Sequence, residues 1–147
     1  MIKINRSALV PYSAADMFAL VDDIDAYKEF LPWCSNSHVL VRDESGVRGE
    51  IELRKGKVRK SFITQNINQQ DESITMQLVE GPFKHLEGVW LFQSLKADAS
   101  KVMLELEYEF SNALLKMTVG PVFQQVADRL VDAFCQRAND IYGQGNE

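Results

Sequence analysis

Acid–base chemistry in this chain would have to begin at one of its two histidines, His38 and His85. His85 and Glu87 lie two positions apart in a segment with the pattern of a strand, so their side chains share a face. A carboxylate in that place could orient the imidazole as a general base. Such a spacing more often marks a polar pair on the outer face of a sheet, and we expect that arrangement here.

The other residues that could form a reactive or metal-binding centre are scattered. Glu105, Glu107 and Glu109 alternate with apolar residues, which is typical of a solvated strand face. Cys34 and Cys135 are far apart and belong to no Cys-x-x-Cys motif. The sequence shows no Ser-His-Asp signature and no histidine-rich cluster. We therefore predict no catalytic residues, no metal site and two reduced thiols.

Positive charge gathers in one segment, residues 42–60, which holds seven basic and four acidic side chains. Its densest part surrounds a predicted turn and consists of Arg54, Lys55, Lys57, Arg59 and Lys60. An exposed basic hairpin can contact RNA phosphates, and it can equally be a solvated turn that discourages edge pairing. No aromatic residue lies within 54–60. We therefore expect any RNA contact there to involve backbone or shape, without base stacking.

Composition limits the class of protein. The chain has 147 residues, of which 46% are hydrophobic and 25% charged, as in an ordinary soluble domain, and we predict one domain over residues 1–147. Its net charge of −5 gives no general attraction to DNA or to anionic lipid, so we expect no DNA partner. The opening Met-Ile-Lys-Ile-Asn lacks the regions of a signal peptide, which favours a cytoplasmic location.

Hydrophobic periodicity predicts the elements that must position these residues. A strand over 2–10 precedes a short helix, whose N-cap we assign to Ser13 with Asp16 as its partner. A loop or broken helix follows over 22–37. Alternating apolar residues then predict an antiparallel meander of about six strands, which includes 46–54, 58–68, 72–79, 84–95 and 102–110.

The last third of the chain changes to helical spacing. Its apolar positions recur every three or four residues, at Leu115, Val119, Val122, Phe123, Val126, Leu130, Phe134, Ala138 and Ile141. Pro121 predicts a kink or a fresh start, and Gly143 a C-terminal cap. A sheet with one apolar face needs a cover, which this long helix can supply. The sequence therefore predicts an α+β fold.

The order of these elements and several sequence strings resemble the START-like helix-grip superfamily, which includes polyketide cyclases and lipid-transport proteins. Within it, the chain is similar to the subfamily of RatA ribosome-association toxins and coenzyme Q-binding START-like proteins. The strings that carry the resemblance include Pro11-Tyr12-Ser13-Ala14, Phe30-Leu31-Pro32-Trp33-Cys34, Gly81-Pro82-Phe83-Lys84, Phe110-Ser111-Asn112 and Gly120-Pro121-Val122-Phe123. Lys28 departs from the pattern, which has proline after the tyrosine.

The resemblance implies a curved antiparallel sheet wrapped around a long C-terminal helix, with an apolar cavity between them. We expect the cavity to hold a hydrophobic molecule such as ubiquinone or another isoprenoid lipid, and no further cofactor. The residues expected to bind it are Trp33, Phe83, Trp90, Phe92, Leu106, Tyr108, Phe123, Val126 and Leu130. Of these, Tyr108, Trp90 and Trp33 could donate a hydrogen bond to a quinone head.

Three functions remain open at this point. The first is a non-enzymatic quinone-binding protein that supports respiration. The second is a toxin that binds the large ribosomal subunit through Arg54, Lys55, Lys57, Arg59 and Lys60 and blocks subunit joining. The third is an enzyme similar to a polyketide cyclase or dehydratase. The aromatic-rich loop 24–37 is expected to act as a lid or to touch a membrane surface.

Overall fold

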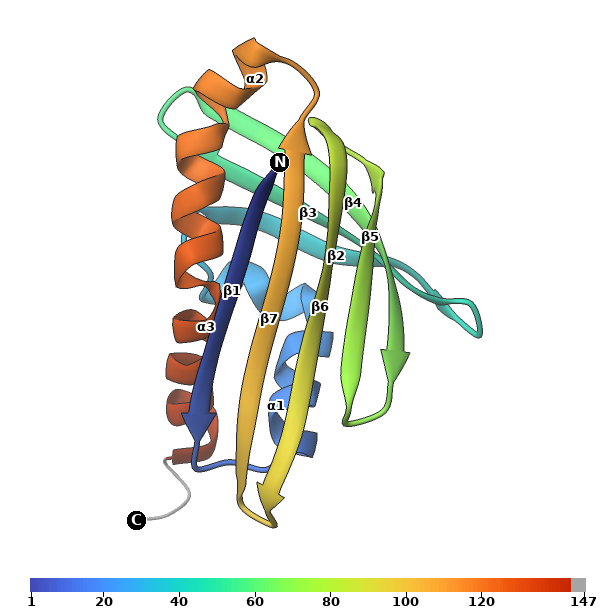
Figure 1. The fold of residues 1–147 in the computed structure, drawn as a ribbon, viewed down its shortest axis with the longest axis vertical. Helices are drawn as coiled ribbons and strands as arrows, with labels where there is room; N and C mark the ends of the chain where they lie inside the picture. The colour runs from blue at the N-terminus through green and yellow to red at the C-terminus, as the bar shows by residue number, and fades with distance from the viewer. Residues whose placement is uncertain (144–147) are drawn as a thin grey trace.

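A computed structural model describes residues 1–143 of the chain, so the last four residues of the predicted domain lie outside the described residues. The described part contains seven strands, three α-helices and a short 3-10 helix, η1 (Figure 1). Their order is β1 (Ile2–Val10), α1 (Ala14–Asp22), η1 (Ile24–Glu29), β2 (Cys34–Asp43), β3 (Gly46–Lys55), β4 (Val58–Gln69), β5 (Ser73–Glu80), β6 (Phe83–Lys96), β7 (Ala99–Phe110), α2 (Ala113–Thr118) and α3 (Gly120–Tyr142).

All seven strands form one antiparallel sheet with the order β1-β7-β6-β5-β4-β3-β2. The strands from β2 to β7 follow one another as hairpins, while β1 pairs with β7 at the other edge. The sheet curves around α3, which runs along β1, and α1 packs inside the same curve (Figure 1). The predicted helix-grip architecture is confirmed.

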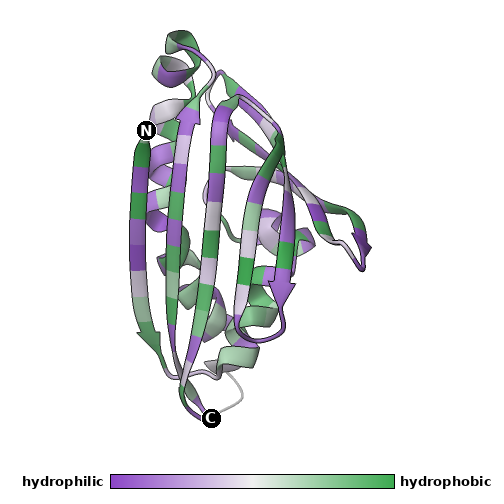
Figure 2. Cartoon of the chain, turned by 45° about the vertical axis from the view of Figure 1, so that its right-hand side comes forward, coloured by the Kyte–Doolittle hydropathy of each residue, from purple (hydrophilic) through white to green (hydrophobic). Residues whose placement is uncertain are grey.

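Alternation along the strands places one face of the sheet in the core. In β7, Val102, Leu104, Leu106, Tyr108 and Phe110 are buried, and the residues between them are less protected. Figure 2 shows the same pattern as alternating hydrophobic and hydrophilic bands along the strands. A strand with this period must bury one face, and the concave side that faces α3 is the one that it buries.

The helices begin where the sequence predicts. The backbone N–H of Asp16 donates to Ser13 Oγ at 3.0 Å, which confirms the N-cap of α1. The predicted C-terminal helix is two helices, because α2 ends at Thr118 and α3 restarts at Gly120, with Pro121 in its first turn. Ile141 continues the apolar spacing of this helix, but it is 45% exposed.

The segment 22–37 contains regular secondary structure, namely η1 and the start of β2. Its aromatic residues are also less exposed than a lid requires. Tyr27 is 8% exposed, and the Phe30 ring packs edge-on against Tyr27 and Phe134. The expectation of a lid or membrane-touching segment over 24–37 is therefore not supported by Tyr27, which is buried, or by Phe30 and Trp33, which are half-buried.

Candidate functional site

A cavity lies between the concave face of the sheet and α3, with a volume of about 80 Å³. Its walls are formed almost wholly by apolar side chains from η1, the strands β2 to β7 and α3. Typical small-molecule pockets measure about 300–1,000 Å³, so an isoprenoid ligand would require α3 or the sheet to move.

Five of the nine residues predicted for the cavity line it: Trp90, Leu106, Phe123, Val126 and Leu130. They come from β6, β7 and α3, which face one another across the core. The α3 residues Phe123, Val126 and Leu130 recur at spacings of three and four, so they share the side of the helix that looks into the sheet.

The structure places the other four predicted residues away from the cavity. Phe83 and Tyr108 pack with Phe110 and Phe123 in an aromatic cluster that fills one end of the core. Phe92 lies toward the opposite end, where its ring packs against Phe18 of α1. Trp33 lies at the edge of the sheet beside the basic hairpin. The alternation of apolar residues predicted correctly which face of each strand is buried. It did not predict where along that face the cavity lies.

Sequence reasoning missed the polar residues of the cavity. Thr64 and Asn66 are 8% and 7% exposed, and Thr64 Oγ1 donates to Asn66 Oδ1 at 3.0 Å. Both line the cavity together with Phe62, two positions before Thr64 on the same face of β4. The spacing of two between Phe62, Thr64 and Asn66 could have predicted from the sequence that the two polar residues share the buried face. Their hydrogen bond to each other offsets the cost of burying two polar side chains in a mostly apolar wall.

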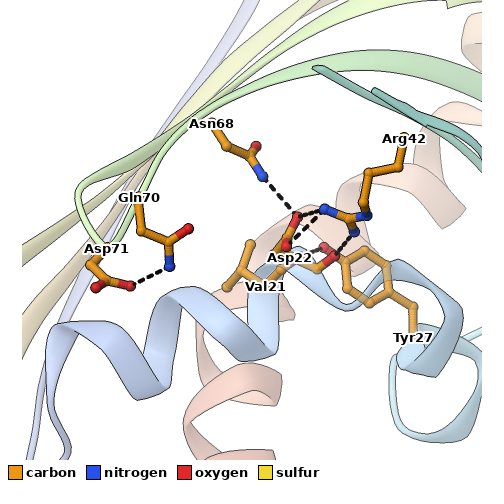
Figure 3. A network of polar contacts seen from close by, with 7 residues as sticks. All are labelled: Val21, Asp22, Tyr27, Arg42, Asn68, Gln70 and Asp71. Atoms are coloured by element: carbon orange, nitrogen blue, oxygen red, sulfur yellow. Dashed lines mark hydrogen bonds and ion pairs between the residues drawn. The ribbon is translucent and has the colours of Figure 1, made fainter. Parts of the chain in front are cut away.

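Tyr27 and a polar network fix the wall of the cavity at η1. The Tyr27 hydroxyl donates to the backbone oxygen of Val21 at the end of α1. Nearby, the carboxylate of Asp22 accepts hydrogen bonds from Arg42 of β2 and Asn68 of β4 (Figure 3). These contacts tie the end of α1 to β2 and β4.

Removing the hydroxyl groups of Tyr27 and Tyr108 should change stability in opposite directions. Both hydroxyls are neutral, because burial raises the pKa of each. Among the described residues, the Tyr108 hydroxyl is buried without a hydrogen-bond partner, whereas that of Tyr27 is bonded. We expect Tyr108→Phe to raise the free energy of unfolding by about 1 kcal/mol and Tyr27→Phe to lower it by about 1–2 kcal/mol. Urea unfolding of both variants measures this, and the same sign for both would contradict it.

His85 lies outside the cavity. Its Nε2 is 3.5 Å from Glu87 Oε1 and 3.5 Å from Glu107 Oε1, so the predicted pair shares a face with a third group. This face is the convex one, opposite the cavity-lining Leu86 and Gly88. His85, Glu87 and Glu107 are close enough together to bind a cation. Exposed acidic groups are common without one, and we assign no metal site to them.

The cysteine of the cavity wall is a poor nucleophile. Cys34 is buried, and its Sγ contacts the backbone oxygen of Asn36 at 3.4 Å. Burial raises the pKa of this thiol, and burial likewise raises the pKa of Cys135. Since the thiolate is the reactive form, both cysteines are suited to packing.

The basic residues form an exposed hairpin between β3 and β4. Gly56 adopts a φ of 59° at the turn, a conformation that glycine accepts without strain. The side chains of Arg54, Lys55, Lys57, Arg59 and Lys60 are all exposed. Arg59 pairs with Glu52 at 3.1 Å, and hydrogen bonds from Ser35 and Arg59 hold the pKa of Glu52 below its usual range.

Lys55 connects this hairpin to α3 and to an aromatic residue distant in sequence. Its Nζ donates to Gln125 Oε1 at 2.8 Å and lies 4.3 Å from the centre of the Trp33 ring. The guanidinium of Arg129 lies 5.5 Å from the same ring. An aromatic residue therefore accompanies the basic hairpin, although residues 54–60 contain none.

The comparisons with known proteins agree with this geometry. Residues 10–135 match the family model described as polyketide cyclase / dehydrase and lipid transport. The chain belongs to this family. The resemblance to START-like proteins drawn from the sequence is thereby confirmed.

Relatives of this family carry names of different kinds. A ribosome association toxin RatA of Pseudomonas aeruginosa is 48% identical over 140 residues, covering 95% of this chain and 97% of the relative. The mitochondrial coenzyme Q-binding protein COQ10 of Dictyostelium discoideum is 24% identical, covering 92% and 68%. The crystal structure of a Streptomyces aromatase/cyclase superposes with a TM-score of 0.81, covering 94% and 93%, at 12% identity, which shows a common fold alone.

Proposed function

We propose that this protein is a RatA-type toxin that associates with the ribosome through the β3–β4 hairpin. The observation that carries the proposal is the exposed group of five basic side chains on a chain whose net charge is −5. Such a distribution favours RNA phosphates at one place and repels them elsewhere. The 48% identity to a ribosome association toxin, over nearly the whole chain, supports the same partner.

The proposed action is to bind the large ribosomal subunit and to block subunit joining, as the resemblance to RatA implies. It requires no catalysis, and it places the protein in the cytoplasm with the ribosomes. Purified subunits mixed with the protein and then allowed to join test this step on a sucrose gradient. We expect fewer joined ribosomes as the protein is added, and an unchanged gradient would contradict the proposal.

A second candidate function is the binding of a hydrophobic molecule such as ubiquinone inside the cavity. The observation that favours it is an apolar cavity with one polar pair, Thr64 and Asn66. Apolar walls suit an isoprenoid tail, and the polar pair suits an oxygen of the quinone ring. The COQ10 relative supports the same class of ligand. The small volume of about 80 Å³ means that binding would be coupled to an opening of the core.

Organic extraction and mass spectrometry of the purified protein test this second function. If the cavity holds a quinone, the extract should contain it, and Ala127→Leu should remove it by filling the space, since Ala127 lines the cavity and is 1% exposed. Ala113→Leu on exposed α2 is the matched control, which should retain the ligand. A wild-type protein that remains empty after incubation with ubiquinone in detergent would contradict the function.

The cyclase-like reading is not proposed. Its candidate base, His85, and the adjacent Glu87 lie on the face of the sheet opposite the cavity, so they do not meet a substrate bound there. The aromatase/cyclase superposes as a fold at 12% identity, which carries no argument about chemistry.

A further inference from the structure

Trp33 is held in an unusual conformation at the base of the basic hairpin. Its φ of 57° is in the left-handed region, which a bulky residue rarely adopts. The Arg54 N–H donates to the Trp33 backbone oxygen at 2.9 Å, so the loop before β2 is fixed to the end of β3. The side chain is half-buried. Strain of this kind persists where surrounding contacts over-determine it, and it concentrates at functional sites.

Two cationic side chains cover the Trp33 ring. Lys55 Nζ lies 4.3 Å and the Arg129 guanidinium 5.5 Å from its centre, and both side chains are exposed. Cation–π contacts at exposed sites are weak, so either cation can turn to a phosphate and leave the ring accessible. We call Trp33, Lys55 and Arg129 the Trp33 platform.

The platform is bounded on the α3 side. Arg137, eight residues after Arg129, lies over the Phe30 ring at 4.9 Å and faces Glu29 at 3.7 Å. The carboxylate offsets the charge of Arg137, so the positive surface ends before it. On the other side the platform continues into the basic residues of the hairpin, of which Lys57 and Lys60 make no ion pair among residues 1–143.

We propose that the Trp33 platform binds a single-stranded RNA segment, with an unpaired base stacked on the indole and its neighbouring phosphates on Lys55, Arg129 and the hairpin. This inference rests on the proposed ribosome association and names the kind of RNA that the same surface contacts. An aromatic ring flanked by cations is the arrangement that sequence-tolerant single-strand binding uses. The proposal differs from the expectation of RNA contact without base stacking, because the fold brings an aromatic residue from outside 54–60 to the hairpin.

A lipid surface fits these residues less well than RNA. Membrane insertion needs a group of exposed apolar side chains beside the basic ones. Residues 54–60 present five exposed cations and an exposed glycine, and their one apolar residue, Val58, is half-buried. The hairpin therefore offers charge with little apolar area, which matches a polyanion.

Trp33→Asn tests the proposal, because asparagine tolerates the left-handed backbone while it removes the ring. Trp33→Phe keeps a ring in the same place. Each variant is titrated with a labelled oligouridine and with inorganic polyphosphate, which has the charge without the bases. We expect Trp33→Asn to weaken oligouridine binding about tenfold, to leave polyphosphate binding unchanged, and Trp33→Phe to retain most of the affinity for oligouridine. Thermal unfolding of both variants confirms that the fold is kept.

Three outcomes would overturn the proposal. They are oligouridine affinity of Trp33→Asn equal to wild type, an equal loss for polyphosphate, or Trp33-dependent binding to phosphatidylglycerol vesicles in place of RNA. The proposed function is judged separately, by wild-type binding to ribosomal subunits. If the wild type binds oligouridine through Trp33 and ignores ribosomes, the platform stands and the toxin function fails.

Discussion

Replacing Lys55, Lys57, Arg59 and Lys60 with glutamine should weaken association with ribosomes about a hundredfold or more. All four side chains are exposed at the β3–β4 hairpin. Each phosphate contact contributes roughly 0.7–0.9 to the slope of log affinity against log salt concentration. Four lost contacts should therefore lower the affinity by a factor on the order of one hundred or more at physiological salt, and flatten the slope by about three. Co-sedimentation of the variant with ribosomal subunits measures both quantities.

A charge-matched control separates the hairpin from the overall charge. Lys57→Gln with Lys60→Gln removes two charges from the hairpin, and Lys96→Gln with Lys101→Gln removes two from the β6–β7 turn at the opposite end of the sheet (Figure 1). The first pair should weaken ribosome association strongly and the second only slightly. Equal losses for the two pairs would mean that net charge, and not the hairpin, governs binding.

Trp90→Ala should lower the free energy of unfolding by about 3–5 kcal/mol. Trp90 is 2% exposed, stacks on Phe92 and packs edge-on against Phe134 of α3. It therefore joins the sheet to the helix beside the cavity, and truncation enlarges a space that already exists. A domain of this size has a total stability of about 5–15 kcal/mol, so the variant should unfold at much lower urea concentration than wild type.

The second tryptophan of the chain provides the comparison for this stability measurement. Trp33 is half-buried and packs against two exposed cations. Trp33→Asn should therefore cost much less stability than Trp90→Ala. A Trp90→Ala variant as stable as Trp33→Asn would show that the sheet and α3 are not held together at Trp90.

The strands with clean alternation could be predicted from the sequence, and β2 could not. Residues 34–43 read Cys-Ser-Asn-Ser-His-Val-Leu-Val-Arg-Asp, with polar residues in the first half and three consecutive apolar residues later. The pairing of β2 with β3 is interrupted between Cys34 and Asn36 and again between Val39 and Val41. A bulge shifts which face each residue meets, so a period-two pattern is lost.

The sequence predicted which strand and helix faces enclose the cavity, but not how far along those faces the cavity extends. Period two places Leu106 and Tyr108 on the same face of β7, and nothing local says which one meets empty space. The difference arises from Phe83, Phe110 and Phe123, which converge from three elements and fill the end of the core at Tyr108. Packing of this kind depends on residues that are distant in sequence.

The contact between Trp33 and the basic hairpin was unpredictable for a similar reason. Trp33 follows an irregular segment, and its backbone is fixed by a hydrogen bond from Arg54, across the pairing of β2 with β3. Only the register of that pair brings the ring to Lys55. Sequence alone indicated the charge of the surface, and the fold supplied its aromatic residue.

Co-sedimentation of the wild-type protein with separated ribosomal subunits over a salt series tests the central claim most directly. The account predicts that the protein pellets with the large subunit at low salt, and that log affinity falls linearly with log salt concentration, as displacement of counterions from phosphates requires. A protein that stays in the supernatant with both subunits at the lowest salt would contradict the proposed function. Binding that salt does not weaken would contradict the role of the hairpin.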